Sequence, residues 1–389
     1  MRYFDYNATS PLHPAAREAW LEAADRYWHN PSSLSAAATA ARECLEDARE
    51  RLADMLGCDA ERILFTGSAT AANNALARQV AMASPGRAVL SPLEHPCVAE
   101  SFAAALTGGV VELPVDRAGR VEMDKVVDVL DRHSTVAIVS VLAASNETGV
   151  LEPWQELLEC CRSRQIPFHT DAVQWIGRLP ADALGQCDYL TGSGHKFGGP
   201  KGIGFLVVPE TTTLFHGDRG GPQQNGRWAG TENLPGVLAM VAALEALAAE
   251  TNGFSQAAIE PRRQARDRAE QMIVAALPEV IVLGQAAERL WNTLALIVPG
   301  HDGRRLVAGL ERQGIIASTG SACSSGSEAT ARAVAAIGPE RLGLATDKPW
   351  GMLRLSAGWE TTATDWQAAA EAVITVVSQP SRPAQVRLG

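Results

Sequence analysis

The sequence predicts an α/β fold with a large domain on a mostly parallel seven-stranded sheet, followed by a smaller α+β domain. Short apolar runs alternate with amphipathic helical stretches between residues 60 and 208, which is typical of β-α units with helices on both faces of a sheet. A helix-rich stretch follows from Leu234 to Leu277, and a second mixed unit runs from Val280 to Val377. The chain of 389 residues is long enough for two domains with their own cores.

Seven short apolar runs are the predicted strands of the large sheet. In chain order they span Ile63–Phe65, Ala88–Leu90, Val110–Leu113, Val136–Val141, Ile166–His169, Asp188–Leu190 and Ile203–Val208. Leu294–Val298 and Met352–Ser356 are predicted strands of the smaller domain. We place the large domain at residues 12–250 and the small domain at 251–389, joined by an N-terminal segment, 1–11.

Composition and charge limit the classes of function. The 34 basic and 44 acidic residues leave a net charge of −10, which argues against a nucleic-acid partner because phosphate contacts need clustered lysine and arginine. The longest apolar run, Val237–Leu244, is too short to span a bilayer, so no membrane partner is expected. The seven cysteines include no CxxC pair, so neither a metal site nor a disulfide framework is predicted. Met1–Asn7 has no features of a secretory signal, and we expect a cytoplasmic protein.

The stretch Thr191–Gly202, TGSGHKFGGPKG, surrounds Lys196 with glycines. The simplest interpretation is a solvated lysine on a flexible surface loop. The alternative is a lysine that a flat, bulky ligand approaches closely, because glycine has no Cβ and tolerates unusual backbone angles. Lysines used in this way typically form a Schiff base.

Asp171 comes directly after a predicted strand. One interpretation is the N-cap of a helix that begins at Ala172. The other is an anion that holds a ring nitrogen protonated, which a pyridine cofactor needs in order to act as an electron sink.

Two further strand ends carry polar residues. The stretch Phe65–Asn74, FTGSATAANN, completes a strand and opens a helix whose N-terminus could bind phosphate, although capping by Ser68 or Thr70 explains it equally well. His95 follows another strand and is either structural or stacked on a flat ring. With Lys196 and Asp171, these features come from four strand ends and together describe a pyridoxal phosphate site.

Nine sequence blocks extend this picture over nearly the whole chain. They are YFDYNATSP (Tyr3–Pro11), NPSS (Asn30–Ser33), EHP (Glu94–Pro96), NETG (Asn146–Gly149), DAVQ (Asp171–Gln174), SGHK (Ser193–Lys196), GTEN (Gly230–Asn233), GSAC (Gly320–Cys323) and RLS (Arg354–Ser356). With these blocks in this order, the sequence resembles the cysteine desulfurase (NifS/IscS-like) group of the class V, fold-type I pyridoxal phosphate enzymes.

The resemblance implies a role for each matching position. Lys196 would bond the cofactor and move protons at the substrate Cα, Asp171 would pair with the ring nitrogen, and His95 would stack on the ring. The other residues implied at the cofactor are Ala69, Thr70, Asn146, Gln174, Ser193 and His195, with Thr231 reaching the phosphate in the partner subunit of a homodimer. The residues implied at the substrate carboxylate are Asn7, Asn146 and Arg354.

Cys323 lies among serine and glycine residues in ASTGSACSSGS (Ala317–Ser327), where exposure is more plausible than burial in a core. An exposed thiol with a lowered pKa is a nucleophile. The resemblance implies that Cys323 takes sulfur from L-cysteine as a persulfide, leaving L-alanine, and passes the sulfur to an acceptor protein that the sequence does not identify.

Several positions depart from the pattern of the group. Ala71 stands where glutamate is usual, and Gln224, Asn225 and Trp228 stand where relatives carry charged residues. The catalytic set is intact, so we expect these departures to change the surface that docks the sulfur acceptor.

Other functions remain open at this point. A selenocysteine lyase or another class V lyase would use the same cofactor, although Cys323 argues against simple elimination. A non-catalytic binding protein that retains the fold is the alternative from another class, and the visible absorbance of a bound cofactor that shifts with L-cysteine would separate it from the enzymes.

Overall fold

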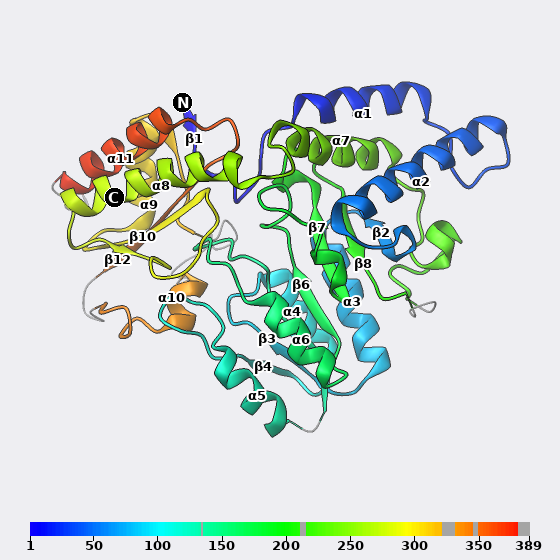
Figure 1. Ribbon diagram of the computed structural model, residues 1–389, viewed down its shortest axis with the longest axis horizontal. Coiled ribbons are helices and arrows are strands. Elements are labelled where there is room, and N and C mark those ends of the chain that lie inside the picture. The colour runs from blue at the N-terminus through cyan, green and yellow to red at the C-terminus, as the bar shows by residue number, and fades with distance from the viewer. Residues whose placement is uncertain (134, 211–214, 321–330, 345–348, 380–389) are drawn as a thin grey trace, which may run out of the picture. The chain divides into compact units, whose positions relative to one another are not determined.

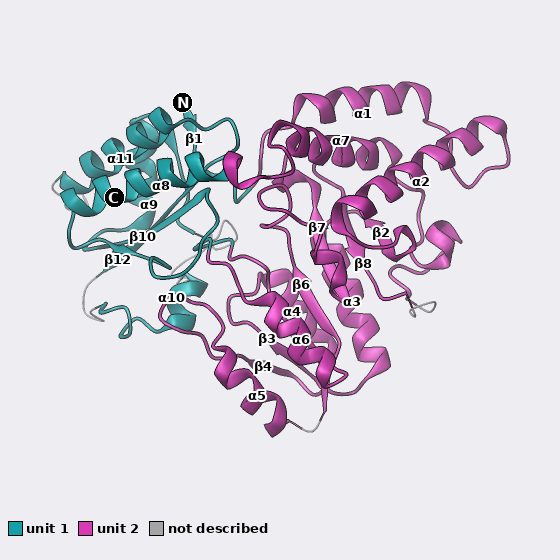
Figure 2. Ribbon diagram, in the orientation of Figure 1, with its two compact units in different colours: residues 1–8, 146–149, 259–389 teal, residues 9–145, 150–258 magenta. Residues whose placement is uncertain are grey.

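The structure is a computed structural model that describes residues 1–133, 135–210, 215–320, 331–344 and 349–379. The chain divides into two compact units, coloured separately in Figure 2. The large unit consists of residues 9–145 and 150–258, and the small unit of residues 1–8, 146–149 and 259–389. Each unit therefore gathers segments that are far apart in the sequence.

The large unit is built on a seven-stranded sheet with the order β2-β8-β7-β6-β5-β3-β4 (Figure 1). The strands are β2 (Ile63–Thr66), β3 (Arg87–Leu90), β4 (Val110–Glu112), β5 (Val136–Ser140), β6 (Phe168–Asp171), β7 (Tyr189–Ser193) and β8 (Gly204–Val207). Strand β8 runs antiparallel to β2 and β7, and all other neighbours are parallel. The predicted α/β fold is confirmed, and every strand overlaps a predicted run.

Helices cover this sheet, and strands such as β2, β6 and β7 are buried along their whole length. Continuous apolar runs are the expected sequence of strands that are buried on both faces. The helices of the large unit are α1 (Pro14–Arg26), α2 (Ala36–Leu56), α3 (Ala69–Ala83), α4 (Pro96–Ala105), α5 (Met123–Arg132), α6 (Trp154–Ser163) and α7 (Leu234–Glu250), with short 3₁₀ turns η1 (Ala60–Arg62), η2 (Leu184–Gln186), η3 (Gly194–Lys196) and η4 (Gln223–Gly226). Helix α3 packs on α4, while α1 and α2 pack on α7.

The small unit has a three-stranded antiparallel sheet in the order β12-β10-β9. Its strands are β9 (Ile281–Val282), β10 (Thr293–Pro299) and β12 (Trp350–Ser356). Its helices are α9 (Gly303–Arg312), α10 (Arg332–Ile337) and α11 (Ala363–Ser378). Helix α8 (Gln256–Ala276) begins in the large unit and continues in the small unit from residue 259. Strands β10 and β12 match the two predicted for this part of the chain.

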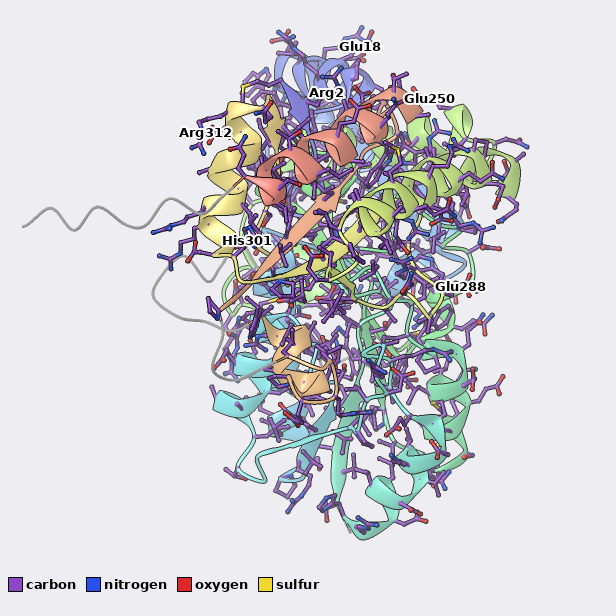
Figure 3. All side chains as sticks on the ribbon, turned by 90° about the vertical axis from the view of Figure 1, so that its left-hand side faces the viewer. Arg2, Glu18, Glu250, Glu288, His301 and Arg312 are labelled. Carbon is purple, nitrogen blue, oxygen red and sulfur yellow. The ribbon has the colours of Figure 1, made fainter. Side chains whose placement is uncertain are left out.

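The first residues of the chain belong to the small unit. Strand β1 (Arg2–Tyr3) pairs in parallel with β11 (Ile315–Ile316). The Phe4 ring meets the Trp366 ring edge-on, with centroids 4.9 Å apart. Arg2, labelled in Figure 3, forms a 2.8 Å ion pair with Asp365 of α11.

None of the helices that the structure describes is both long and apolar enough to cross a membrane.

The side chain of Gln224 covers part of the open edge of β2. Its Oε1 accepts a hydrogen bond from the Phe65 N–H at 2.7 Å, and its Nε2 donates to the Phe65 carbonyl at 2.8 Å. Arg49 donates to the Ile63 carbonyl of the same strand at 2.6 Å. Unpaired main-chain groups at a strand edge can bind another chain. The Gln224 and Arg49 side chains bond such groups of β2 and so reduce the exposed edge.

Trp228 lies in the core of the large unit rather than on its surface. It is 7% exposed and belongs to the apolar cluster that includes Leu76 of α3 and Phe102 of α4. A Cβ at Gly217 would lie 2.1 Å from the Trp228 ring, so only glycine fits beside it. The expected change of an acceptor-docking surface therefore does not extend to Trp228, because its side chain is an internal packing group.

We predict that Gln224→Ala lowers the free energy of unfolding by about 1–3 kcal/mol, because both Phe65 main-chain groups lose their side-chain partner. Urea titration followed by circular dichroism measures the change. The control is Gln264→Ala, which removes an exposed side chain bonded only to Glu260 of its own helix and should change stability by less than about 0.5 kcal/mol. Equal stability of the two variants would contradict the edge-covering role.

Candidate active site

The polar residues of the large unit gather beyond the ends of its parallel strands. His95 follows β3, Asp171 ends β6, and Ser193 ends β7, with Lys196 in the η3 turn directly after it. Parallel neighbours bring their carboxyl ends to the same edge of a sheet, which is where ligands of such folds bind. The sequence prediction of a common edge is therefore met for these residues.

Asp171 is buried, with only 6% of its surface exposed. Its Oδ1 accepts a hydrogen bond from the Val173 N–H at 3.0 Å, and its Oδ2 accepts a longer one from Asn73 Nδ2 at 3.4 Å. Burial raises the pKa of Asp171 to about 6, while these hydrogen bonds and the charge of Lys196 act in the opposite direction. Residues 173–178 are turns rather than a helix, so the N-cap interpretation does not apply.

Lys196 is half-buried in the η3 turn and is not a solvated lysine on a surface loop. The glycines around it allow parts of the large unit to approach each other. A Cβ at Gly198, which has φ +92°, would lie 2.9 Å from the Cβ of His13. A Cβ at Gly199 would lie 2.9 Å from the main chain of Gly194. The glycines therefore serve the tight turn that presents Lys196, in addition to any room they leave for a ligand.

His95 caps the N-terminus of α4. Its Nδ1 accepts from the Cys97 N–H at 3.2 Å, and the Cys97 Sγ lies 3.0 Å from the same nitrogen. With Nδ1 accepting, a neutral imidazole carries its proton on Nε2. Burial raises the pKa of the Cys97 thiol to about 12, so this cysteine is protonated and is not a nucleophile.

The N-terminus of α3 is capped by Ser68, whose side chain accepts from the Ala71 N–H at 3.1 Å. This settles which residue caps the helix, because Ser68 and Thr70 were both candidates. Thr70 is exposed, and Ala69 begins the helix beside it. Phosphate binding by this helix end remains a prediction.

Three more predicted residues lie at these strand ends. Ser193 ends β7 and His195 precedes Lys196, while Gln174 follows β6 by three residues. His195 Nδ1 is 3.1 Å from the Thr9 hydroxyl, and burial together with the positive charges of Lys196 and other basic residues lowers the pKa of this histidine to about 4. Ser193 and Gln174 are buried at 3% and 5% exposure. A neutral imidazole at physiological pH can donate or accept a hydrogen bond without adding charge.

The small unit brings together the three residues expected at the substrate carboxylate. Arg354 Nη1 and Asn7 Nδ2 both donate to the Asn146 carbonyl, at 3.0 and 3.1 Å. Arg354 is 1% exposed, and its Nη2 donates to Asp5 Oδ1 at 2.6 Å. Within the described part of the chain, the buried Nε of Arg354 has no hydrogen-bond partner. A carboxylate would satisfy such a donor.

Cys323 and Thr231 are the two remaining residues predicted for the site. Cys323 lies outside the described residues. Thr231 is exposed in the segment before α7, after Gly230, which has φ +106°.

Sequence reasoning missed several residues of these clusters. The sequence pattern assigns no site role to Asn73, which donates a hydrogen bond to Asp171. It also assigns none to Cys97, which contacts His95, or to Asp5, which accepts a hydrogen bond from Arg354. His169 is fully buried in β6. A histidine inside an apolar strand was the one signal available for it, because buried polar groups need partners.

The comparisons with known proteins agree on one family. The class V aminotransferase family profile matches residues 2–368. A protein named cysteine desulfurase IscS from Dictyoglomus turgidum is 34% identical over 370 residues, which cover 93% of this chain and 91% of that relative. A cysteine desulfurase of Sinorhizobium fredii is 37% identical over 343 residues, covering 86% of this chain and 87% of the relative.

Solved structures give the same result for the fold. The X-ray structure of a NifS-like protein from Rickettsia africae superposes with a TM-score of 0.82 at 26% identity, covering 97% of this chain and 99% of that one. The architecture is that of the fold-type I pyridoxal phosphate transferases. The chain belongs to the class V aminotransferase family, and within it resembles the cysteine desulfurases, as its sequence blocks predicted.

We predict that Asp171→Asn stabilises the cofactor-free protein at neutral pH. The raised pKa means that the folded state is penalised whenever Asp171 is ionised, so the gain in unfolding free energy is on the order of 1–3 kcal/mol above about pH 6. Below that pH the folded state protonates Asp171, and the gain shrinks as the pH falls toward the ordinary value of 3.8. Denaturant titrations of both proteins at several pH values measure this. A pH-independent loss of stability would contradict it.

Proposed function

We propose that this protein is a pyridoxal 5'-phosphate-dependent cysteine desulfurase, which converts L-cysteine to L-alanine and passes the sulfur through Cys323 to an acceptor protein. The observation that carries the proposal is the buried Asp171 carboxylate beside Lys196 at the strand ends of a chain whose full-length relatives are named cysteine desulfurases.

The residues of the large unit fit the cofactor. A buried carboxylate with a raised pKa is suited to a cationic ring nitrogen, because the opposite charge offsets the loss of hydration. Asp171 would hold that nitrogen, Gln174 the phenolic oxygen, and His95 would cover the ring face. The N-terminus of α3 at Ala69 and Thr70 would hold the phosphate together with Ser193 and His195, since helix N-termini attract anions.

When bound, pyridoxal phosphate supplies an electron sink that acidifies the substrate Cα–H bond. Lys196 would hold the cofactor through its Nζ, and the same nitrogen would move the proton at the substrate Cα. Burial excludes water around Asp171 and strengthens each electrostatic contact there.

The substrate carboxylate would be held in the small unit. Arg354 is fixed by Asp5 and by the Asn146 carbonyl, which Asn7 also contacts. A guanidinium held in one orientation loses little freedom on binding a carboxylate and matches its geometry. Asn146 and Asn7 would position the substrate through the same cluster.

The sulfur step assigns the nucleophile to Cys323. Its thiolate would attack the sulfur of L-cysteine, so that a new S–S bond forms as the Cβ–S bond breaks. The electron pair of the broken bond stays on the carbon and is protonated, which yields L-alanine. Cys323 retains a persulfide, and an acceptor thiol then takes the outer sulfur and restores the enzyme.

We predict that Cys323→Ser keeps the visible absorbance of the bound cofactor and its shift on adding L-cysteine, while alanine and sulfide formation fall about a thousandfold or more. A serine hydroxyl is not ionised near neutral pH and forms no persulfide. Cys160→Ser is the matched control, because Cys160 lies half-buried in α6, and it should retain full activity.

The same assay separates the alternatives. Selenium leaves more readily than sulfur, so a selenocysteine lyase would release alanine from selenocysteine without Cys323. Alanine release from L-cysteine at the wild-type rate by Cys323→Ser would overturn the persulfide mechanism. Absence of cofactor absorbance in the wild type would favour the non-catalytic binding protein.

We also propose a homodimer in which Thr231 reaches the phosphate bound by the partner subunit. Two-fold dimers are the commonest soluble oligomers, and Thr231 is exposed rather than packed in its own unit. Light scattering should give twice the chain mass. Thr231→Val should bind the cofactor about tenfold more weakly and remain dimeric, while Thr375→Val, on the exposed face of α11, should do neither. An active monomer would contradict the proposal.

A further inference from the structure

A continuous row of polar side chains connects Glu94 to Asp171 inside the large unit. Its successive contacts are Glu94 Oε1 to Ser140 Oγ (3.1 Å), Ser140 Oγ to His169 Nδ1 (2.8 Å), His169 Nε2 to Thr191 Oγ1 (3.0 Å), Thr191 Oγ1 to Asn73 Oδ1 (2.8 Å) and Asn73 Nδ2 to Asp171 Oδ2 (3.4 Å). The residues come from β5, β6, β7, α3 and the loop before α4.

Every member of the row is buried. Glu94, Ser140, His169, Thr191 and Asn73 are all 0% exposed, and Asp171 is 6% exposed. Bulk water therefore does not supply alternative partners, and each group depends on its neighbours in the protein. Unpaired polar groups at such depth destabilise the fold, so each donor of the row must meet an acceptor.

Burial keeps the His169 ring neutral, and with a neutral ring the row can run in only two directions, because each hydroxyl has a single proton. If Asp171 is ionised, the Asn73 amide donates to it, Thr191 donates to Asn73 Oδ1, and Thr191 must then accept from His169 Nε2–H. His169 Nδ1 in turn accepts from Ser140, whose remaining partner must donate. That partner is Glu94, which is therefore the protonated acid.

In the opposite direction, Asp171 and Glu94 exchange their protonation states. Asn73 would be turned so that its oxygen faces Asp171, which would then have to be protonated, while Glu94 would be ionised and His169 would carry its proton on Nδ1. The row thus holds one negative charge, either at Asp171 or at Glu94, and the tautomer of His169 reports which.

The surroundings favour the charge at Asp171. The Val173 N–H donates to Asp171, and Lys196 lies near it. Burial raises the pKa of Glu94 well above the ordinary range, and the like charges of Asp171 and Glu152 act in the same direction, which outweighs the opposing hydrogen bonds of Ser140 and the Leu142 main chain. Burial also lowers the pKa of His169 to about 3, which keeps the ring neutral so that one nitrogen donates and the other accepts.

We propose that Glu94, His169 and Thr191 are positioning residues. They hold Asp171 as a charged hydrogen-bond acceptor, because each hydrogen bond of the row donates in the direction of Asp171. The direction of the row is a property of the large unit alone. Its benefit to a protonated ring nitrogen rests on the proposed function.

The tautomer of His169 tests the direction in the cofactor-free protein. Nitrogen-15 NMR of histidine-labelled protein should show His169 neutral, with the proton on Nε2, between about pH 7 and about pH 8, where Asp171 is ionised; the His169→Gln variant identifies the signal. A proton on Nδ1, or on both nitrogens, would overturn the proposal. Infrared spectroscopy should show a protonated carboxylic acid at neutral pH that is lost in Glu94→Gln.

Matched variants of Thr191 test the positioning role. Thr191→Val keeps the shape but removes the hydroxyl, and should weaken pyridoxal phosphate binding about tenfold. Thr191→Ser restores the hydroxyl and should bind within about twofold of wild type. Equal affinity of the two variants would overturn the role, and if Thr191→Val does not fold, weakened binding by Thr191→Ser would do so. Failure of the wild type to bind pyridoxal phosphate would overturn the proposed function, while the His169 tautomer would still decide the direction of the row.

Discussion

The arrangement of polar groups in the large unit depends on one constraint, the burial of the Asp171 carboxylate at the end of a sheet strand. An ion removed from water is strongly unfavourable unless partners replace its hydration. Asp171 receives the Val173 main-chain N–H, the Asn73 amide and the nearby positive charge of Lys196. These partners leave its pKa raised, so part of the unfavourable energy remains in the folded protein. A site that is strained in this way is stabilised when a cation arrives.

Arg354 in the small unit shows the opposite treatment of a buried charge. Asp5 neutralises it directly, and the Asn146 carbonyl takes a second donor. Arg354 is buried and Asp5 is partly exposed, so removing Asp5 would leave the guanidinium without its charge partner and destabilise the fold. The Arg354 guanidinium is therefore fixed before any ligand binds, because folding itself sets its orientation.

The sequence is a good guide to the sheet because its strands are continuous apolar runs separated by helical patterns. It also predicts that Asp171 and Lys196 lie at strand ends, where the structure has them, since polar residues directly after buried strands are easily recognised. It fails where contacts join distant side chains. The resemblance predicts a surface role for position 228, yet the Trp228 side chain packs beside Gly217 as part of the core. The pairing of Gln224 with Phe65 and of Asp5 with Arg354 depends on tertiary geometry that no local pattern encodes.

The pairing of β1 with β11 has a consequence for biosynthesis. Arg2 lies opposite Ile315, and Tyr3 opposite Ile316. Residues 2 and 3 are therefore made more than three hundred residues before their strand partner, and they cannot pair until β11 has been synthesised. The large unit can form during translation, whereas the small unit is completed only near its end, because domains fold as their segments emerge and distant pairings form slowly. Until then Phe4 lacks the Trp366 ring that later packs against it, so a nascent chain that stalls in this interval exposes an aromatic side chain to chaperones.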